Sequence, residues 1–388
     1  MKLFFTLSSV IIIIGLLNAC GDSTHTTEQS SPSPIIMDTT YHHFYIGTYT
    51  RKEGHVNGVA EGVYCYKMNY ETGKISHVST LTGLINPSFV VLHPNKKWLY
   101  AVQEHGGAGN FSTGTVSSIL VDTATHQMTL QNTVSAQGAA PCHLSISADG
   151  NYVLVANYVG GNIAALPIQA DGTLGEATDV VKHTGKNPHA HYINTGRDGK
   201  IYVADLGISQ TLVYDLKDGK FRLQHSFQSA DGAGTRHLAY YTSYLDPEKT
   251  FIYALNELNG TIDVLKIAEK LQLIQTVSTT KNSGASEVSS AAIKISLDGR
   301  FLYASNRADY NNLAIYRIEP TNGKLSRMEM QSTFGDTPRD FAIDPENRFL
   351  LVANQDSGDI VTFEIQEDGT LTKIQQATVA SPVCIVFE

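Results

Sequence analysis

Apolar and polar residues alternate along this chain in short runs, and one phrase built from such a run recurs seven times. The phrase begins with aromatic or aliphatic residues and ends on a polar residue, most often Asn. Its last residue occupies positions 48, 103, 157, 205, 256, 306 and 354, so successive copies are 55, 54, 48, 51, 50 and 48 residues apart. A period of this length indicates one repeated supersecondary unit, because a single unit cannot bury its apolar face alone.

Each period contains four predicted strands that are separated by turn signals. Within residues 141–181, alternating apolar runs are divided by Asp149-Gly150, by Gly160-Gly161 and by Asp171-Gly172. Two-residue turn signals between alternating runs predict antiparallel hairpins. Because the body of the chain shows no helical periodicity, the sequence predicts an all-β fold, a seven-bladed β-propeller of four-stranded antiparallel blades.

The two ends of the repeat predict how the ring closes. The first unit enters at Tyr41 with its second-strand phrase and lacks a preceding innermost strand. The last residues, 381–388, resemble the innermost strands expected at 86–92 and 140–146. We therefore expect the C-terminal strand to complete the N-terminal blade, which would remove two exposed strand edges at once.

The N-terminal segment differs in composition from the repeat. Residues 1–19 combine Lys2 with an apolar stretch too short to favour a spanning helix, and Leu-Asn-Ala precedes Cys20. This pattern resembles the lipobox of bacterial lipoproteins, with cleavage before Cys20 and acylation of its thiol; an ordinary secretory signal is the alternative. Residues 20–40 predict a flexible tether and residues 41–388 the propeller. We expect an exported protein, lipid-anchored to a bacterial membrane and facing the periplasm or the exterior.

Composition narrows the class of protein further. The chain has 388 residues and a formal net charge of −9, which argues against nucleic-acid binding because that function needs a basic face. Cys65, Cys142 and Cys384 lack the even number and close spacing of a disulfide framework, so we expect them to be small buried residues on strands. No Cys or His spacing typical of a metal site occurs, and we expect no cofactor.

One face of the predicted ring collects the residues that carry chemistry. In each blade, the innermost strand begins and the second strand ends on this face. Counting back from the phrase endings places His143, His191 and His237 at one level, with Arg339 one residue away in register. The ends of the second strands add a larger polar set: Glu104, Asn157, Tyr158, Asp205, Asn256, Glu257, Asn306, Arg307, Asn354 and Gln355.

This collection of side chains predicts a binding site and, as a further expectation, a catalytic one. Histidine is the usual general base near neutral pH. The planar guanidinium of arginine suits a carboxylate or a phosphate. The Asn and Asp residues that end the phrases are expected to bond neighbouring backbone groups rather than a ligand.

The ordered phrases of the chain resemble one protein family. They include Y-I-G-T-Y-T, P-C-H-L-S, P-H-A-H, R-H-L, L-N-E-L and T-P-R-D-F. Their order is similar to that in the seven-bladed β-propeller lactonases, which contain bacterial 6-phosphogluconolactonases and are related to fungal carboxy-cis,cis-muconate cyclases. The resemblance covers residues 42–387 and implies metal-independent opening of a sugar lactone in carbohydrate (glucose) metabolism. It departs at Lys186-Asn187, where Arg-Gln is common, and at Thr235, where Pro is common.

The resemblance implies roles for individual residues. We expect His191 or His237 to take a proton from water, with Glu257 orienting the base or sharing its role. Arg307 and Arg236 would stabilise charge on the carbonyl oxygen. The expected substrate-binding residues are His143, His189, Arg236, Arg339, Glu104 and Lys186. The expected ligand is a small lactone, and the protein is expected to be a monomer.

Three alternatives stay open at this point. A muconate-type cyclase or lyase would need a base and an anion-binding group but no water. A calcium-dependent lactonase would use Asn157, Asp205, Asn256 and Glu257 as oxygen ligands. A non-catalytic surface propeller would bind a glycan or a protein at the same place. Whether the lactone carries a phosphate is also open, because Lys186 stands where the family commonly has Arg.

Overall fold

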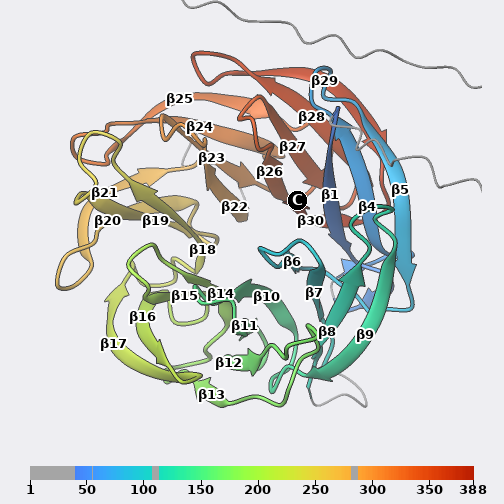
Figure 1. Cartoon of the computed structure of the whole chain (residues 1–388). Helices are drawn as coiled ribbons and strands as arrows, with labels where there is room; N and C mark the ends of the chain where they lie inside the picture. The colour runs from blue at the N-terminus through green and yellow to red at the C-terminus, as the bar shows by residue number, and fades with distance from the viewer. Residues whose placement is uncertain (1–39, 55, 107–112, 281–286) are drawn as a thin grey trace, which may run out of the picture. The chain divides into compact units, whose positions relative to one another are not determined.

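Seven four-stranded antiparallel sheets form the body of the protein. The computed structural model describes residues 40–54, 56–106, 113–280 and 287–388. The sheets are blades around a central axis, with their innermost strands toward that axis (Figure 1). The described residues contain no helix, and thus none that could span a membrane. The predicted seven-bladed β-propeller is confirmed.

Each of the first four blades runs from an innermost strand at the axis to an outer strand at the rim. Blade one consists of β30 (Pro382–Phe387), β1 (Tyr41–Thr48), β4 (Gly62–Asn69) and β5 (Ile75–Thr82). Blade two consists of β6 (Val90–Leu92), β7 (Trp98–Gln103), β8 (Thr115–Val121) and β9 (Met128–Ser135). Blade three consists of β10 (Pro141–Ile146), β11 (Tyr152–Asn157), β12 (Asn162–Pro167) and β13 (Asp179–Lys182). Blade four consists of β14 (Ala190–Thr195), β15 (Ile201–Asp205), β16 (Gln210–Lys217) and β17 (Lys220–Gln228).

The last three blades repeat the same order, and one small hairpin is added. Blade five consists of β18 (Thr235–Thr242), β19 (Thr250–Asn256), β20 (Thr261–Lys266) and β21 (Gln272–Ser278). Blade six consists of β22 (Ser290–Ile295), β23 (Phe301–Asn306), β24 (Asn312–Ile318) and β25 (Leu325–Ser332). Blade seven consists of β26 (Pro338–Ile343), β27 (Phe349–Asn354), β28 (Asp359–Ile365) and β29 (Leu371–Thr378). The hairpin is formed by β2 (Lys52–Glu53) and β3 (Val56–Asn57).

Ring closure depends on the pairing of β30 with β1. The two strands are antiparallel, with Phe44 opposite Phe387. On its other side β30 reaches blade seven, because the amide of Ile385 donates a hydrogen bond to Asp340 Oδ2 at 3.1 Å. Ile385 also packs in an apolar cluster with Phe349 of β27. The expectation that the C-terminal strand completes the N-terminal blade is confirmed.

The recurring phrase is nearly continuously apolar because the second strand of each blade is buried on both faces. In β27, Phe349 and Leu351 pack toward blade one, whereas Leu350 and Val352 pack toward blade six. Successive residues of a strand point to opposite faces, so a strand held between two blades needs apolar residues at both sets of positions. The hydrophobic core therefore consists of layers between neighbouring blades.

Two further expectations from the sequence concern the cysteines and the N-terminal segment. Cys65, Cys142 and Cys384 are buried and form no disulfide bond, as expected. Burial raises the pKa of each of these thiols. The expected signal segment, Cys20 and almost all of the expected tether lie outside the described residues.

We predict that Ile385→Ala lowers the free energy of unfolding by about 2–5 kcal/mol, because it removes a buried side chain from the closing strand. Urea denaturation followed by tryptophan fluorescence would measure the change. Leu273→Ala is the matched control, since Leu273 lies on an outer strand and is 50% exposed; its expected effect is within about 0.5 kcal/mol. Equal effects of both substitutions would contradict the role given to β30.

Candidate active site

A β-bulge recurs where the innermost strands begin. These strands begin, and the second strands end, on one face of the ring, which we call the mouth. In blade three, Cys142 is the extra residue between Pro141 and His143. A bulge adds one residue to a strand and re-aims its side chain. The same bulge in blades four, five and seven places His191, Arg236 and Arg339 on the axis. Together with Cys142 these side chains line one small cavity, which we call the funnel.

The three histidines do not lie at one level, and this part of the sequence prediction is wrong. Tyr192, rather than His191, occupies in blade four the register position that His143 and His237 occupy in blades three and five. The reason is the turn 196–200, which is one residue shorter than its counterpart in blade three. His191 therefore lies one residue nearer the mouth, at the level of the bulge.

The imidazoles nevertheless form one cluster. The ring of His237 lies 5.4 Å from that of His143 and 5.2 Å from that of His191. All three side chains are buried: His143 is 5% exposed, His191 is 6% exposed and His237 is 8% exposed. Burial, followed by the positive charge of Arg236, lowers the pKa of His143 to about 3 and holds the pKa values of His191 and His237 well below 6.5. All three imidazoles are therefore neutral at pH 7 and able to accept a proton.

Two arginines share one carboxylate at the mouth. Glu257 Oε2 lies 2.8 Å from Arg236 Nε, and Glu257 Oε1 lies 2.8 Å from Arg307 Nη2. Ser289 donates to the same carboxylate at 3.3 Å, and Arg236 also donates to the carbonyl of Ala291. Burial acts to raise the pKa of Glu257, but the two guanidiniums outweigh it and hold that pKa below its usual value. Glu257 is therefore an ionised anchor for both cations.

Arg339 is a half-buried cation without a carboxylate partner in the described part of the chain. Its guanidinium lies 5.2 Å from the centre of the Tyr49 ring. The Tyr49 hydroxyl donates to Glu104 Oε2 at 2.9 Å, and Ser88 donates to the same oxygen. Burial opposes the charge of Arg339, but Tyr49 and Glu104 raise its pKa above the usual value. Its donors are available for an oxygen that carries or develops negative charge.

His189 and Lys186 lie outside this cluster. His189 stacks on Tyr158 with 4.4 Å between ring centres, and the Tyr158 ring in turn contacts His191 at 5.7 Å. Lys186 is exposed and makes no ion pair with any described residue. The structure thus brings together most of the predicted site residues: His143, His191, His237, Arg236, Arg307, Arg339, Glu104 and Glu257.

The polar residues that end the second strands have structural contacts. Asp205 accepts hydrogen bonds from the His183 ring at 2.6 Å and from the His189 amide at 2.8 Å. Asn256 Oδ1 accepts a hydrogen bond from Thr235 at 2.9 Å. These bonds occupy oxygens that the calcium alternative required as ligands, so they argue against that alternative.

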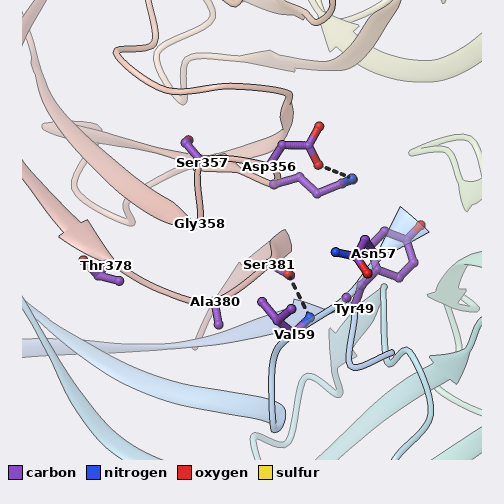
Figure 2. Close-up of a pocket in the computed structure, with 11 residues that line it drawn as sticks. Tyr49, Asn57, Val59, Asp356, Ser357, Gly358, Thr378, Ala380 and Ser381 are labelled. Carbon is purple, nitrogen blue, oxygen red and sulfur yellow. Dashed lines mark hydrogen bonds between the residues drawn. The ribbon is translucent and has the colours of Figure 1, made fainter. Parts of the chain in front are cut away.

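A groove opens at the mouth between blade seven and blade one (Figure 2). Its volume is about 560 Å³. One wall carries Asn57 and Val59, and the other carries Asp356 and Ser357. The Tyr49 ring lines the groove while its hydroxyl reaches Glu104, so Tyr49 joins the groove to the funnel. None of the described residues that line the groove is a lysine or an arginine.

Sequence reasoning did not single out Tyr49 or Ser289. Tyr49 belongs to the phrase Y-I-G-T-Y-T, whose place in the ordered set was the available signal. A single tyrosine gives no indication that its hydroxyl reaches Glu104, 55 positions further along the chain. Ser289 directly precedes β22, and no pattern in the chain marked it.

Comparison with known proteins agrees with this geometry. The family model described as lactonase, 7-bladed beta-propeller, matches residues 43–387. The chain belongs to the seven-bladed β-propeller lactonase family. This lactonase is similar to the 6-phosphogluconolactonase of Bacillus subtilis (strain 168), with 32% identity over 356 residues that cover 88% of this chain and 97% of the relative.

Two solved structures of similar proteins agree with this family assignment. It is similar to a candidate 6-phosphogluconolactonase of Bacteroides fragilis, with a TM-score of 0.80 and 31% identity, covering 92% of this chain and 100% of the other. It is also similar to the periplasmic gluconolactonase of Pseudomonas aeruginosa, with a TM-score of 0.78 and 28% identity, covering 89% and 99%. The resemblance read from the ordered phrases is confirmed, and lactone hydrolysis is the reaction class of this chain.

We predict that kcat/KM of the lactonase stays nearly constant from pH 8 to below pH 6. Protonation of His191 or His237 requires the pH to fall through a pKa well below 6.5, so the proton-accepting form persists across this range. Initial rates corrected for spontaneous ring opening at each pH would measure the profile. An acid limb with an apparent pKa near 6.5 would contradict a buried neutral base and would indicate a solvent-exposed imidazole.

Proposed function

We propose that this protein hydrolyses a sugar lactone at the outer end of the funnel. The funnel cavity of about 10 Å³ has room for about one water molecule, which attacks the lactone carbonyl carbon. The observation that carries the proposal is that His191, His237, Arg236 and Arg339 line one cavity. A neutral imidazole and a guanidinium without a carboxylate partner are the two groups that the reaction needs, a proton acceptor and a stabiliser of negative charge.

We assign the role of general base to His191. It lies at the same level as Arg339, and its buried Nδ1 makes no hydrogen bond with any described residue. The imidazole takes a proton as the water oxygen bonds to the carbonyl carbon and an electron pair moves onto the carbonyl oxygen. The bond from carbon to the ring oxygen then breaks, and the ring oxygen takes the proton back. The product is the open hydroxy acid. His237 packs against the His191 ring and supports its position.

We assign the stabilisation of the carbonyl oxygen to Arg339, with Arg236 beside it. Both oxygens of Glu257 are already paired with guanidiniums. Glu257 therefore positions Arg236 and Arg307 rather than transferring a proton. This arrangement holds the donors in place before the substrate arrives, which is how fixed dipoles and charges lower a barrier most effectively.

We propose further that the substituent of the lactone is uncharged and rich in hydroxyl groups. The groove next to Tyr49 offers the side chains of Asn57, Asp356 and Ser357 as hydrogen-bonding partners. A phosphate placed there would meet the Asp356 carboxylate and no cation among the described lining residues. The competing substrate is a 6-phosphorylated lactone, which the name of the Bacillus subtilis relative suggests.

The decisive experiment compares the hydrolysis of glucono-δ-lactone and of its 6-phosphate by the purified protein, with and without EDTA. We expect turnover of the unphosphorylated lactone at least as efficient as that of the phosphate. Arg339→Gln should lower kcat by about 10²–10³-fold, the loss typical of one oxyanion donor. His191→Ala should lower it by about 10²–10⁴-fold. His77→Ala is the control, because His77 is exposed on the outer strand β5.

The outcomes separate the reaction from its substrate. No rate above spontaneous ring opening with either lactone would overturn the proposed hydrolysis. Efficient turnover of the phosphate alone would leave the hydrolysis standing and overturn the uncharged substituent. Unchanged melting temperatures of the variants would show that a loss of rate is not a loss of fold.

We also propose that the protein is exported and anchored to a membrane through an acylated Cys20. The support is the sequence pattern of Lys2, an apolar stretch and Leu-Asn-Ala before Cys20. Acyl chains on one terminal residue would hold the protein stably at a membrane surface if more than one chain is attached.

We predict that Cys20→Ser moves the protein out of the membrane fraction of lysed cells and abolishes incorporation of labelled fatty acid. Cys65→Ser is the control, because Cys65 is buried inside the propeller and should not affect fractionation. A Cys20→Ser protein that still sediments with membranes and still carries label would contradict the anchor.

A further inference from the structure

A cluster of metal-ligating side chains lies on the face of the ring opposite the mouth. His43 is near the start of β1, and Glu388 directly follows the end of β30. His126 belongs to the turn between β8 and β9 in blade two. The cluster therefore joins the closing blade to its neighbour, far from the ends of the strands that carry the funnel.

The three side chains are close enough to share one ion. One ligand atom from each of His43, His126 and Glu388 lies within 4.8 Å of the others. The two imidazole rings lie face to face, with centres 3.5 Å apart and planes inclined by 19°. Glu388 Oε2 is 3.5 Å from His126 Nδ1.

The surrounding structure holds the cluster in position. The amide of Glu388 donates to the carbonyl of His43 at 2.9 Å, and Ser79 donates to the carbonyl of His126 at 2.6 Å. His126 is only 8% exposed, and its buried Nδ1 makes no hydrogen bond with any described residue. A buried ring nitrogen without a hydrogen bond, next to a carboxylate, points to a ligand that would complete its bonding.

We propose that His43, His126 and Glu388 bind a divalent transition-metal ion, for which zinc is the best match. Two imidazole nitrogens and one carboxylate oxygen are a donor set that zinc takes in sites with an open fourth position. Calcium and magnesium prefer oxygen donors alone. Imidazole ligates in its neutral form.

Binding requires a small rearrangement of side chains. A metal ion lies close to the plane of each imidazole that binds it, and two stacked rings cannot both meet this condition. One ring must tilt out of the stack, and His43 is the less buried of the two. An ion held there would connect the turn of blade two to both closing strands, and it should therefore raise the melting temperature of the whole ring.

The test is a titration of the metal-free, untagged full-length protein with zinc chloride, followed by calorimetry and by thermal denaturation. We expect one ion per chain and a rise in melting temperature. Glu388→Gln and His126→Ala should each weaken zinc binding at least tenfold and abolish the rise. Glu388→Gln is the safer variant, because it alters a residue outside the strands and should leave the fold intact.

His77→Ala is the matched control. His77 is exposed on the outer strand β5 of blade one. It belongs neither to the proposed cluster nor to His42, Asp344 and Glu346, a second group of described residues close enough to share an ion. This variant should bind zinc as the unaltered protein does. The proposal is overturned if the unaltered protein takes up no zinc at micromolar concentrations, if both cluster variants bind normally, or if His77→Ala removes the binding. Because these readouts need no substrate, the result is independent of the proposed hydrolysis.

Discussion

The pairing of β30 with β1 is the constraint on which the rest of the structure depends. Blades related by one repeat could also stack as an open array, and each blade would then place its bulge residue at a different point in space. Closure instead brings residues from blades three, four, five and seven to one axis. It also pairs both edges that an open ring would expose. The funnel is therefore a property of the closed ring and of no single blade.

Burial determines the chemistry of the funnel in two opposite ways. The same exclusion of water that keeps His191 and His237 neutral is costly for the guanidiniums beside them. Arg236 and Arg307 offset that cost by sharing Glu257. Arg339 instead lies over the ring of Tyr49. An aromatic ring stabilises a cation and leaves the hydrogen-bond donors of the guanidinium available. A neutral base and an available cation can thus coexist in one buried cavity.

Sequence reasoning predicted the repeat, the closure and most of the residues that lie together at the mouth, because each of these follows from local patterns. The phrase is apolar since its strand is buried on both faces, as Leu350 and Leu351 show. The level of His191 could not be predicted, because a turn shorter by one residue shifts the count. The sharing of Glu257 by two arginines depends on how blades five and six pack. The groove depends on the hairpin of β2 and β3, which is not part of the repeat. No periodic pattern in the sequence indicates either feature.

The balance of charge at the mouth bears on the nature of the substrate. Around the funnel, four cations face three carboxylates, which leaves one positive charge in excess. The cations are Arg236, Arg307, Arg339 and Lys294, and the carboxylates are Glu104, Glu257 and Asp340, which pairs with Lys294. One excess charge matches the single negative charge that develops on a lactone carbonyl oxygen. A phosphate monoester carries a charge of about −1.5 to −2 near neutral pH. It would compete with the carbonyl oxygen for Arg339, because the exposed Lys186 lies outside the funnel, on the loop before β14. An uncharged substituent leaves Arg339 to the reaction.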